Sequence, residues 1–514
     1  MSATLTPVQA PAVTSPAAAR PASASSRRKW YTLAVLCLSL LITVVDSTIV
    51  NVALPTLARD LRAGTSGLQW ITDSYTLAFA ALLLLAGAIA DRFGRQRSLA
   101  AGLTVFAVGS LAAALTQTTA ELIAARAVMG IGAAFIMPAT LSILTTVFTD
   151  RGERAKAIGI WSAISGLGVA IGPVVGGVLL SHFGWDSIFL VNLPLTAIAL
   201  AAGHWLVPAS RSPVARRLDV AGAVTSVAAF TALTWALIAA PASGWLSGAT
   251  LGRMAGAGVL LAAFTVIEAR SDHPMLPLSL FRNRRLAGAA IALLVLFFAL
   301  SGTVFLTTQI YQVVLGYSPL AAGLRALPSA MSLAIAAAAG AHLAKRVGAR
   351  VPVAGGLALV TAGLGFFATA TAASSYTHYV IAMMLVAGGV GLAMSAATTL
   401  TMEQLPPALA GVGSAVNDAT RNMGSVLGVA VVGSVSASVF ASRLASRQLH
   451  AASVGQAAAA AHHAGGHAAS MVHAIAWAFV GGADYGVLAA AAVTLAGVGI
   501  AIATLRPRGG RSQG

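Results

Sequence analysis

Long apolar runs occupy most of this sequence from about residue 30 onwards. A helix that crosses a bilayer needs roughly 20 apolar residues, because its side chains face hydrocarbon while its backbone bonds internally. The sequence therefore predicts an all-α integral membrane protein of about fourteen transmembrane helices. The segments that meet the requirement are 30–54, 68–90, 98–117, 121–147, 157–180, 187–207, 219–240, 250–268, 286–314, 318–343, 351–372, 376–401, 410–440 and 483–505.

The charge content supports lipid as the main solvent. Only 9% of the residues are charged, whereas soluble domains carry about 25%. The net charge of +17 could suggest a nucleic-acid partner. The Lys and Arg residues, however, lie in short clusters between apolar runs and form no basic stripe with aromatic platforms. We therefore expect a lipid bilayer and no nucleic acid as partner.

The basic clusters also predict an orientation. When the links between spans are assigned alternately to two sides, 23 Lys and Arg residues fall on the side of the N-terminus and five on the other. The remaining three of the 31 lie within or near spans. Because cytoplasmic loops are enriched in Lys and Arg, both termini are predicted to be cytoplasmic, in a multi-pass plasma (inner) membrane protein.

The tails and one long link are low in complexity. Residues 1–29 are rich in Ala, Pro, Ser and Thr, which predicts a disordered cytoplasmic tail, and 506–514 form a second one. The link 441–476 is predicted to be extracellular. A zinc site is one interpretation of its histidines, but no Cys or carboxylate joins them, so we favour a polar linker and expect no metal or other cofactor. These histidines are His462, His463, His467 and His473.

Two links share a pattern that suits a conformational latch. In residues 87–95, Gly87 allows close helix packing, Gly94 allows a tight turn, and Asp91 with Arg92 and Arg95 can make charge-assisted contacts to helix ends. An ordinary basic loop is an equal alternative. Residues 340–350 repeat this pattern more weakly, without the aspartate. Two similar links, one in each half of the chain, indicate an internal duplication of the kind that transporters carry.

The fifth predicted span carries a stripe of small residues. Gly168, Gly172 and Gly176 recur every four residues and so form one smooth helix face. Pro173 removes a backbone donor and bends the helix beside Gly177. The combination predicts a bent helix that packs closely against moving neighbours.

Ionisable residues inside spans are costly and are functional candidates by default. Burial disfavours a charged carboxylate and a nearby arginine favours it, so such a pair can bind and release a proton. For Asp46 and Arg126 we favour function over a fixed structural pair. For Asp73, and for Asp418 three residues before Arg421, a functional role and a fixed structural role are equal alternatives. Arg325, Glu403 and Asp484 lie near predicted span ends, where snorkelling or capping explains them.

Enzyme signatures are absent from the sequence. It contains no phosphate-binding Gly-Lys-Ser/Thr loop and no His-Glu-x-x-His motif. We therefore expect no enzymatic activity and no ATP-driven pumping by this chain alone.

Several of these motifs together resemble the major facilitator superfamily, and within it the fourteen-span drug:proton antiporter branch. The similarity covers nearly the whole chain from about residue 30. One departure is Trp185-Asp186-Ser187, where the branch has Trp-Arg-Trp. The residues that carry the resemblance are the 87–97 link, Leu122, Arg126, Gly130 and Gly132, the 168–177 stripe, the 46–55 stretch, Trp70, Asp73, Ser74 and Tyr75, and the 410–433 region with Arg421.

The resemblance implies two six-helix bundles, 30–207 and 271–505, with two inserted helices in 208–270. It also implies alternating access, in which protons entering the cell are exchanged for a small-molecule substrate leaving it. Asp46 and Arg126 would then couple protons, and Asp91 with Arg92 would latch the outward-facing state. The small-residue helix would prevent leakage. The cavity candidates are Asp73, Asp418 and Arg421.

We therefore expect a proton-coupled exporter of drugs, antibiotics or other amphipathic molecules that acts as a monomer. Export of an endogenous metabolite, such as a siderophore or an amino acid, is the alternative among transporters. A membrane receptor or sensor is the alternative of another class, although it should carry a folded signalling domain. The need for a periplasmic adaptor is left open.

Overall fold

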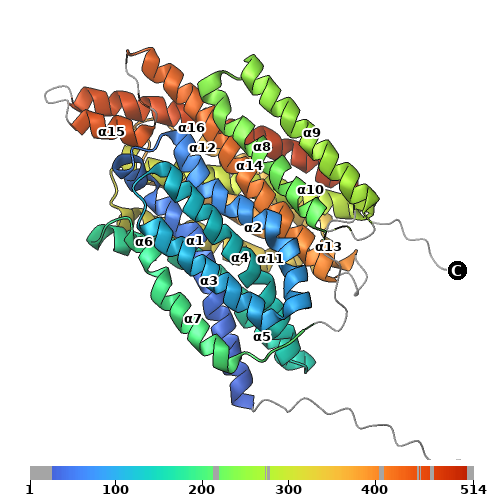
Figure 1. Cartoon of the computed structure of the whole chain (residues 1–514). Coiled ribbons are helices and arrows are strands. Elements are labelled where there is room, and N and C mark those ends of the chain that lie inside the picture. Colours follow the sequence, from blue (N-terminus) through green and yellow to red (C-terminus); the bar gives the residue numbers. More distant parts are fainter. Residues whose placement is uncertain are drawn as a thin grey trace, which may run out of the picture.

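The chain folds into long helices, and the structure, a computed structural model, describes residues 26–211, 219–271, 274, 278–404, 410–448, 451, 453–462 and 468–505. Every regular element in these ranges is a helix (Figure 1). Thirteen helical segments are long and apolar enough to cross a membrane, and the helix α2, bent by 52°, brings the number to fourteen. The predicted all-α membrane fold is confirmed.

Six spans form the N-terminal bundle. Helices α2 and α3 pack on α4, and α1 packs on α5 and α7. Close approach depends on glycine: a side chain at Gly132 in α4 would lie 2.6 Å from the backbone nitrogen of Phe106 in α3. The bounds are α1 (Ser26–Asp60), α2 (Thr65–Phe93), α3 (Arg95–Ala114), α4 (Thr119–Val147), α5 (Arg151–His182), and α6 (Ser187–Leu190) with α7 (Asn192–Leu206), which share the sixth span.

Two further spans form a hairpin beside both bundles. Helices α8 (Val220–Ser243) and α9 (Gly248–Arg270) pack on each other, and α8 also contacts α2 and α14. This hairpin is the predicted inserted pair, and it covers one seam between the bundles (Figure 1).

The C-terminal bundle repeats the six-span arrangement. Helix α10 packs on α14, α11 on α13, and α12 on both α13 and α16. A short π-helix, η2, continues α10 within one span. The bounds are η1 (Leu278–Arg282), α10 (Arg284–Gln309), η2 (Ile310–Val314), α11 (Pro319–Val347), α12 (Arg350–Phe367), α13 (Tyr376–Glu403), α14 (Ala410–Ala445) and α16 (Ala468–Thr504).

The link expected at 441–476 is shorter and more helical in the structure. Helix α14 continues to Ala445, α15 spans Val454–His462, and α16 begins at Ala468, well before the expected 483. Alanine, which is frequent in this stretch, has the highest helix propensity, and from Ser470 onwards the stretch is also part of an apolar span. His473 lies in α16, whereas His463 and His467 lie outside the described residues, as do the tails 1–25 and 506–514.

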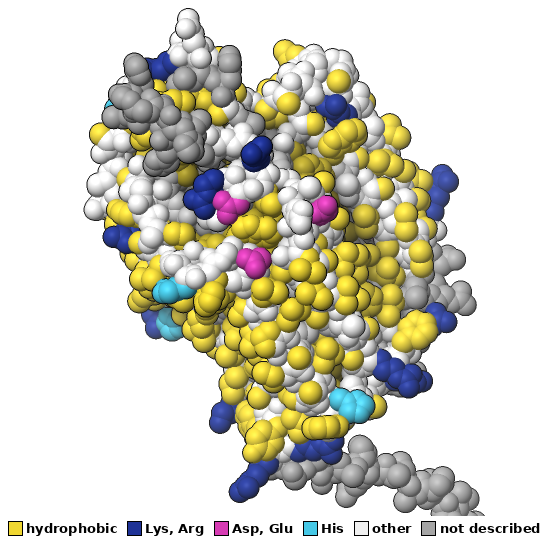
Figure 2. All heavy atoms as spheres, turned by 60° about the vertical axis from the view of Figure 1, so that its left-hand side comes forward, with side chains coloured by type: hydrophobic (Ala, Val, Ile, Leu, Met, Phe, Trp, Pro, Cys, Tyr) yellow, Lys and Arg dark blue, Asp and Glu magenta, His cyan; other side chains and the backbone are white. Residues whose placement is uncertain are grey.

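The outer surface of the helices is apolar, as lipid requires. Figure 2 shows a face covered largely by hydrophobic side chains, with Lys and Arg mainly towards its upper and lower parts. Large apolar side chains such as Trp205, Leu495 and Ile335 are exposed by more than half of their area. Such exposure would be costly in water and is ordinary against hydrocarbon.

Candidate functional site

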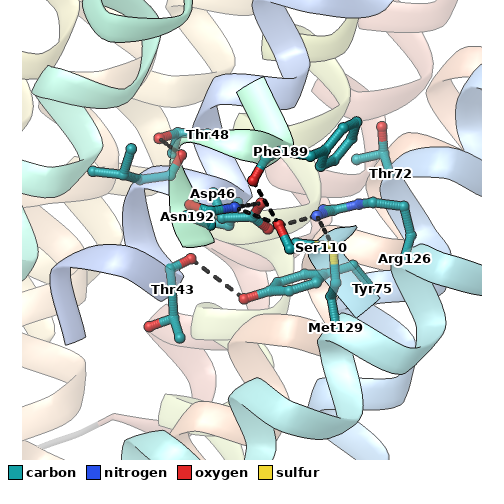
Figure 3. Close-up of polar contacts among 12 residues, drawn as sticks. Thr43, Asp46, Thr48, Thr72, Tyr75, Ser110, Arg126, Met129, Phe189 and Asn192 are labelled. Atoms are coloured by element: carbon teal, nitrogen blue, oxygen red, sulfur yellow. Dashed lines mark hydrogen bonds and ion pairs between the residues drawn. The ribbon is translucent and has the colours of Figure 1, made fainter. Parts of the chain in front are cut away.

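A buried ion pair lies inside the N-terminal bundle. The Asp46 carboxylate on α1 is 0% exposed and the Arg126 side chain on α4 is 1% exposed, and Nη1 of the arginine donates to Oδ2 of the aspartate. Sequence reasoning singled out both residues, and the structure brings them together (Figure 3). A charge in this setting persists only because its partner compensates for the lost hydration.

The ion pair extends into a network of uncharged polar groups. The amide of Asn192, at the start of α7, donates to Oδ1 of Asp46 and to Oγ of Ser110 on α3, at 3.0 Å each. Ser110 donates in turn to the carbonyl of Phe189 at 2.8 Å. Sequence reasoning missed Asn192 and Ser110 because it considered ionisable residues only. The available signal was an asparagine in the middle of an apolar run.

Helix α2 completes the surroundings of the arginine. The Arg126 guanidinium lies 4.3 Å from the ring centroid of Tyr75, and its Nε donates to the carbonyl of Ile71 at 3.3 Å. The Tyr75 hydroxyl donates to the carbonyl of Thr43 at 3.3 Å. If a proton neutralises Asp46, the arginine therefore retains a π face and a carbonyl, although neither replaces a full negative charge.

The small-residue stripe on α5 presses against α1 close to Asp46. Side chains built at Gly168, Gly172 and Gly176 would meet Val44, Thr48 and Ile49 of α1 at 2.9 Å or less. Any larger residue on this face would separate α1 from α5. The stripe predicted from sequence is therefore a close-packed helix face, and it borders the helix that carries the buried carboxylate.

The same helix also contacts the other bundle. A side chain at Gly177 would lie 2.5 Å from the Cα of Leu320 in α11, and one at Gly323 would lie 2.2 Å from the carbonyl oxygen of Pro173. Helices α5 and α11 thus approach backbone to backbone across the bundle interface.

The three cavity candidates lie apart from this network. Asp73 on α2 is 1% exposed, and its Oδ2 has no hydrogen-bond partner among the described residues. On α14, Arg421 lies 3.5 Å from Asp418 and 4.6 Å from the ring centroid of Phe297. Asp418 and Arg421 therefore form a local pair, whereas Asp73 is a lone buried carboxylate.

Two of the latch residues, Asp91 and Arg95, contact partners of their own bundle in the described part of the chain. Arg95 donates from Nε and Nη2 to Asp91 at 3.0 and 2.9 Å, and from Nη1 to the carbonyl of Ser142 on α4 at 3.2 Å. Gly94 adopts a φ of +113°, which explains the glycine at the turn between α2 and α3. Arg92 is exposed. A Cβ atom added at Gly87 would lie 3.7 Å from the Cβ of Pro138 on α4, which is an ordinary contact distance.

Asp484 lies elsewhere than expected. It was interpreted as a cap at the start of the last span, but α16 begins sixteen residues earlier, so the carboxylate lies in the helix interior. Its Oδ1 is buried and has no hydrogen-bond partner among the described residues. Among all residues that the structure describes, no three His, Cys, Asp or Glu side chains converge as a metal site would require.

Comparison with known proteins places this arrangement in a family. Residues 36–429 match the Major Facilitator Superfamily. The "Multidrug resistance protein Stp" of Mycobacterium tuberculosis is 38% identical over 410 residues, which is 80% of this chain and 76% of that protein. The "Tetracenomycin C resistance and export protein" of Streptomyces glaucescens is 33% identical over 501 residues, which is 94% of this chain and 93% of that protein.

Solved structures support the same fold at much lower sequence identity. A bacterial homologue of the human lysosomal transporter Spinster, in an inward-facing and occupied conformation, superposes with a TM-score of 0.69 at 16% identity. The alignment covers 94% of this chain and 97% of that chain. By its sequence match and its two six-helix bundles, this chain belongs to the Major Facilitator Superfamily and is a multi-pass membrane transporter.

Proposed function

We propose that this protein exports drugs, antibiotics or similar amphipathic molecules in exchange for protons. The observation that carries the proposal is the fully buried Asp46–Arg126 pair with its Asn192 partner, in a chain related over 94% of its length to an antibiotic export protein. The 23-to-5 distribution of basic residues supports cytoplasmic termini, so the end of the bundles that carries α15 is extracellular.

In this proposal Asp46 is the proton-exchanging group. In the ionised state Asp46 holds Arg126, Asn192 and, through Arg126, the α2 backbone at Ile71 in one arrangement. A proton on Asp46 removes the ionic part of that arrangement and leaves the arginine charge uncompensated. The network joins α1, α2, α3, α4 and α7, so its change can be transmitted to the whole bundle.

The residues outside the network have separate roles. Asp418 with Arg421 provides charge at the C-terminal bundle for polar or cationic substrate groups. Asp91 and Arg92 act as the latch at the cytoplasmic end. Among the described residues, Asp91 contacts Arg95 of its own bundle, which fits a state in which the cytoplasmic end is released.

Transport by reconstituted protein tests the proposal. Purified protein in liposomes is given a fluorescent lipophilic cation such as ethidium, or tetracenomycin C, with and without an imposed pH gradient. Transport that depends on the gradient and is lost in Asp46→Asn supports proton-coupled export. Transport at an equal rate without a gradient contradicts proton coupling, and absence of transport with every amphipathic compound in the panel contradicts drug export.

A further inference from the structure

A second buried carboxyl group lies inside the C-terminal bundle, far along the chain from the Asp46 network. Asp484 lies on α16, in the half of that helix nearer to α15, and its Oδ1 is buried without a hydrogen-bond partner among the described residues. The ion pairs among these residues do not include Asp484. Neither capping nor a fixed ion pair therefore explains this carboxyl group, and an ionisable group in such a place is a functional candidate.

Two tyrosine hydroxyls lie in the same region of the bundle. Tyr379 on α13 is 0% exposed and Tyr311 on η2 is 3% exposed, and both hydroxyl oxygens are buried without a hydrogen-bond partner among the described residues. Asp484 lies within electrostatic reach of Tyr379, and Tyr379 lies within electrostatic reach of Tyr311. A hydroxyl donates to a carboxylate and accepts from a carboxylic acid. These surroundings therefore suit both protonation states of Asp484.

An arginine lies on the same face of α16 without pairing with the carboxyl group. The Cζ of Arg443, on α14, lies 4.9 Å from the centroid of the Trp477 ring, and its Nη1 lies 3.5 Å from the Trp477 carbonyl oxygen. Trp477, Gly481 and Asp484 are spaced by four and three residues, so they share one helix face. A side chain at Gly481 would collide with the same Nη1. The guanidinium therefore lies on this face between the tryptophan and the aspartate.

The present contacts of the guanidinium are weak enough to be exchanged. A separation of 3.5 Å is beyond the usual range of a hydrogen bond, and a cation–π contact is weaker than a charge-assisted bond to a carboxylate. The helical rise from Gly481 to Asp484 is about 4.5 Å, at 1.5 Å per residue. A change of side-chain rotamer can therefore carry the Arg443 guanidinium to the carboxylate while both helices stay in place.

The other titratable groups near α16 are exposed, engaged elsewhere or distant. Arg447 of α14 is exposed and lies 4.8 Å from the Trp477 ring centroid. On α16 itself, His473 and Tyr485 are exposed. The His378 ring on α13 makes a hydrogen bond of 2.9 Å to a carbonyl of α12. Helices α10 and α12 carry their arginines at the opposite end of the bundle, and the described side chains of α15 include no titratable group.

We propose that Asp484 is a proton-binding site of the C-terminal bundle and that Arg443 is its movable counter-ion. With a proton on Asp484, the guanidinium rests on Trp477, as it does in this structure. When the carboxyl O–H bond breaks, water at the α15 end takes the proton, and Arg443, which stays charged, turns to the carboxylate and pairs with it. This inference rests on the proposed proton exchange and adds a second proton site, so that each bundle carries one.

Infrared difference spectroscopy of the full-length protein in liposomes tests the proton site. A protonated carboxyl group has a carbonyl stretch that disappears on ionisation, so the difference between acidic and alkaline pH should contain a band from Asp484. Asp484→Asn should remove this band, Asp484→Glu should shift its frequency, and Asp46→Asn should leave it in place. A spectrum that is the same in Asp484→Asn as in the parent would overturn the site. Should Asp484→Asn not fold, a band that fails to shift in Asp484→Glu overturns it equally.

A matched pair of arginine variants tests the counter-ion. Arg443 and Arg447 both lie against the Trp477 ring, but Arg443 is the one that occupies the Gly481 face. Arg443→Gln should raise the proton affinity of the Asp484 band roughly tenfold, because the ionised carboxylate loses its counter-ion. Arg447→Gln should leave the affinity unchanged. Equal affinities in the two variants would overturn the role of Arg443.

The movement of the guanidinium has a signal of its own in tryptophan emission. The difference between the parent and Trp477→Phe isolates the emission of Trp477 from that of the other tryptophans. This emission should change between acidic and alkaline pH, because the guanidinium leaves the ring, and it should stay constant when both proteins also carry Asp484→Asn. A Trp477 emission that does not depend on pH in the parent would overturn the movement.

These measurements do not require transport, so they separate the inference from the proposed function. An Asp484 band that behaves as expected, in a protein whose substrate movement drives no protons, counts against the proposed function alone. A proton-coupled exporter whose band ignores Asp484→Asn overturns the inference and leaves the proposed function intact. A band that Asp46→Asn removes assigns the titration to the other bundle and also overturns the inference.

Discussion

Neutralising one partner of the Asp46–Arg126 pair should be strongly destabilising. In Asp46→Asn the Arg126 charge stays buried without its counter-ion, which costs about 3 to 5 kcal/mol. The Tyr75 ring, 4.3 Å from the guanidinium, and the Ile71 carbonyl offset part of this, so we expect a value near the lower end. Arg126→Gln should cost a similar amount, because it leaves the buried carboxylate without its counter-ion, held by neutral donors such as the Asn192 amide.

The double variant distinguishes an ion pair from two independent residues. Because Asp46→Asn with Arg126→Gln leaves no charge at this buried pair, its cost should fall short of the summed single costs by at least about 2 kcal/mol. The assay is thermal unfolding of the four purified proteins in one detergent, alongside transport in liposomes. We expect both single variants to unfold several degrees earlier and the double variant to recover part of the loss without recovering transport. Additive losses, or a parent-like melting temperature for Asp46→Asn, would refute the reasoning.

Three further substitutions test other parts of the account. Asn192→Leu removes bonds to Asp46 and Ser110 and should cost about 1 to 3 kcal/mol, which thermal unfolding would show; an unchanged melting temperature would contradict a supporting role. Gly177→Ala places a methyl group 2.5 Å from α11 and should slow transport, whereas Gly166→Ala on the same helix meets open space and should not; equal rates would contradict close packing of α5 on α11. Asp91→Asn breaks a partly exposed pair with Arg95 and should cost less than about 1 kcal/mol while reducing transport, so parent-like transport would remove the latch assignment.

The membrane fold was predictable because lipid imposes simple rules on sequence. Spans must be long and apolar, and the distribution of Lys and Arg along the chain checks their number independently. The inserted pair α8–α9 was placed within a few residues for this reason. The start of α16 was not, although the Ala-rich stretch from Ser470 onwards is apolar as well as helix-forming and belongs to the last span.

The charged half of the site was also predictable, but its neutral half was not. Asp46 and Arg126 stand out because ionised groups are rare in spans. Ser110 and Asn192 are ordinary polar residues by sequence, and only the packing of α3 and α7 shows which atoms they contact. The tertiary arrangement, rather than residue type, therefore determined which polar groups joined the network.

Proton movement driven by substrate alone tests the central claim most directly. Liposomes containing the protein and an internal pH indicator are given a substrate gradient and no initial pH gradient. In an exchanger, substrate flux in one direction must drive protons in the other, so the internal pH should change with a sign set by the direction of the substrate gradient. Asp46→Asn should show no such change. Substrate movement with no proton movement in the parent protein would contradict proton-coupled export.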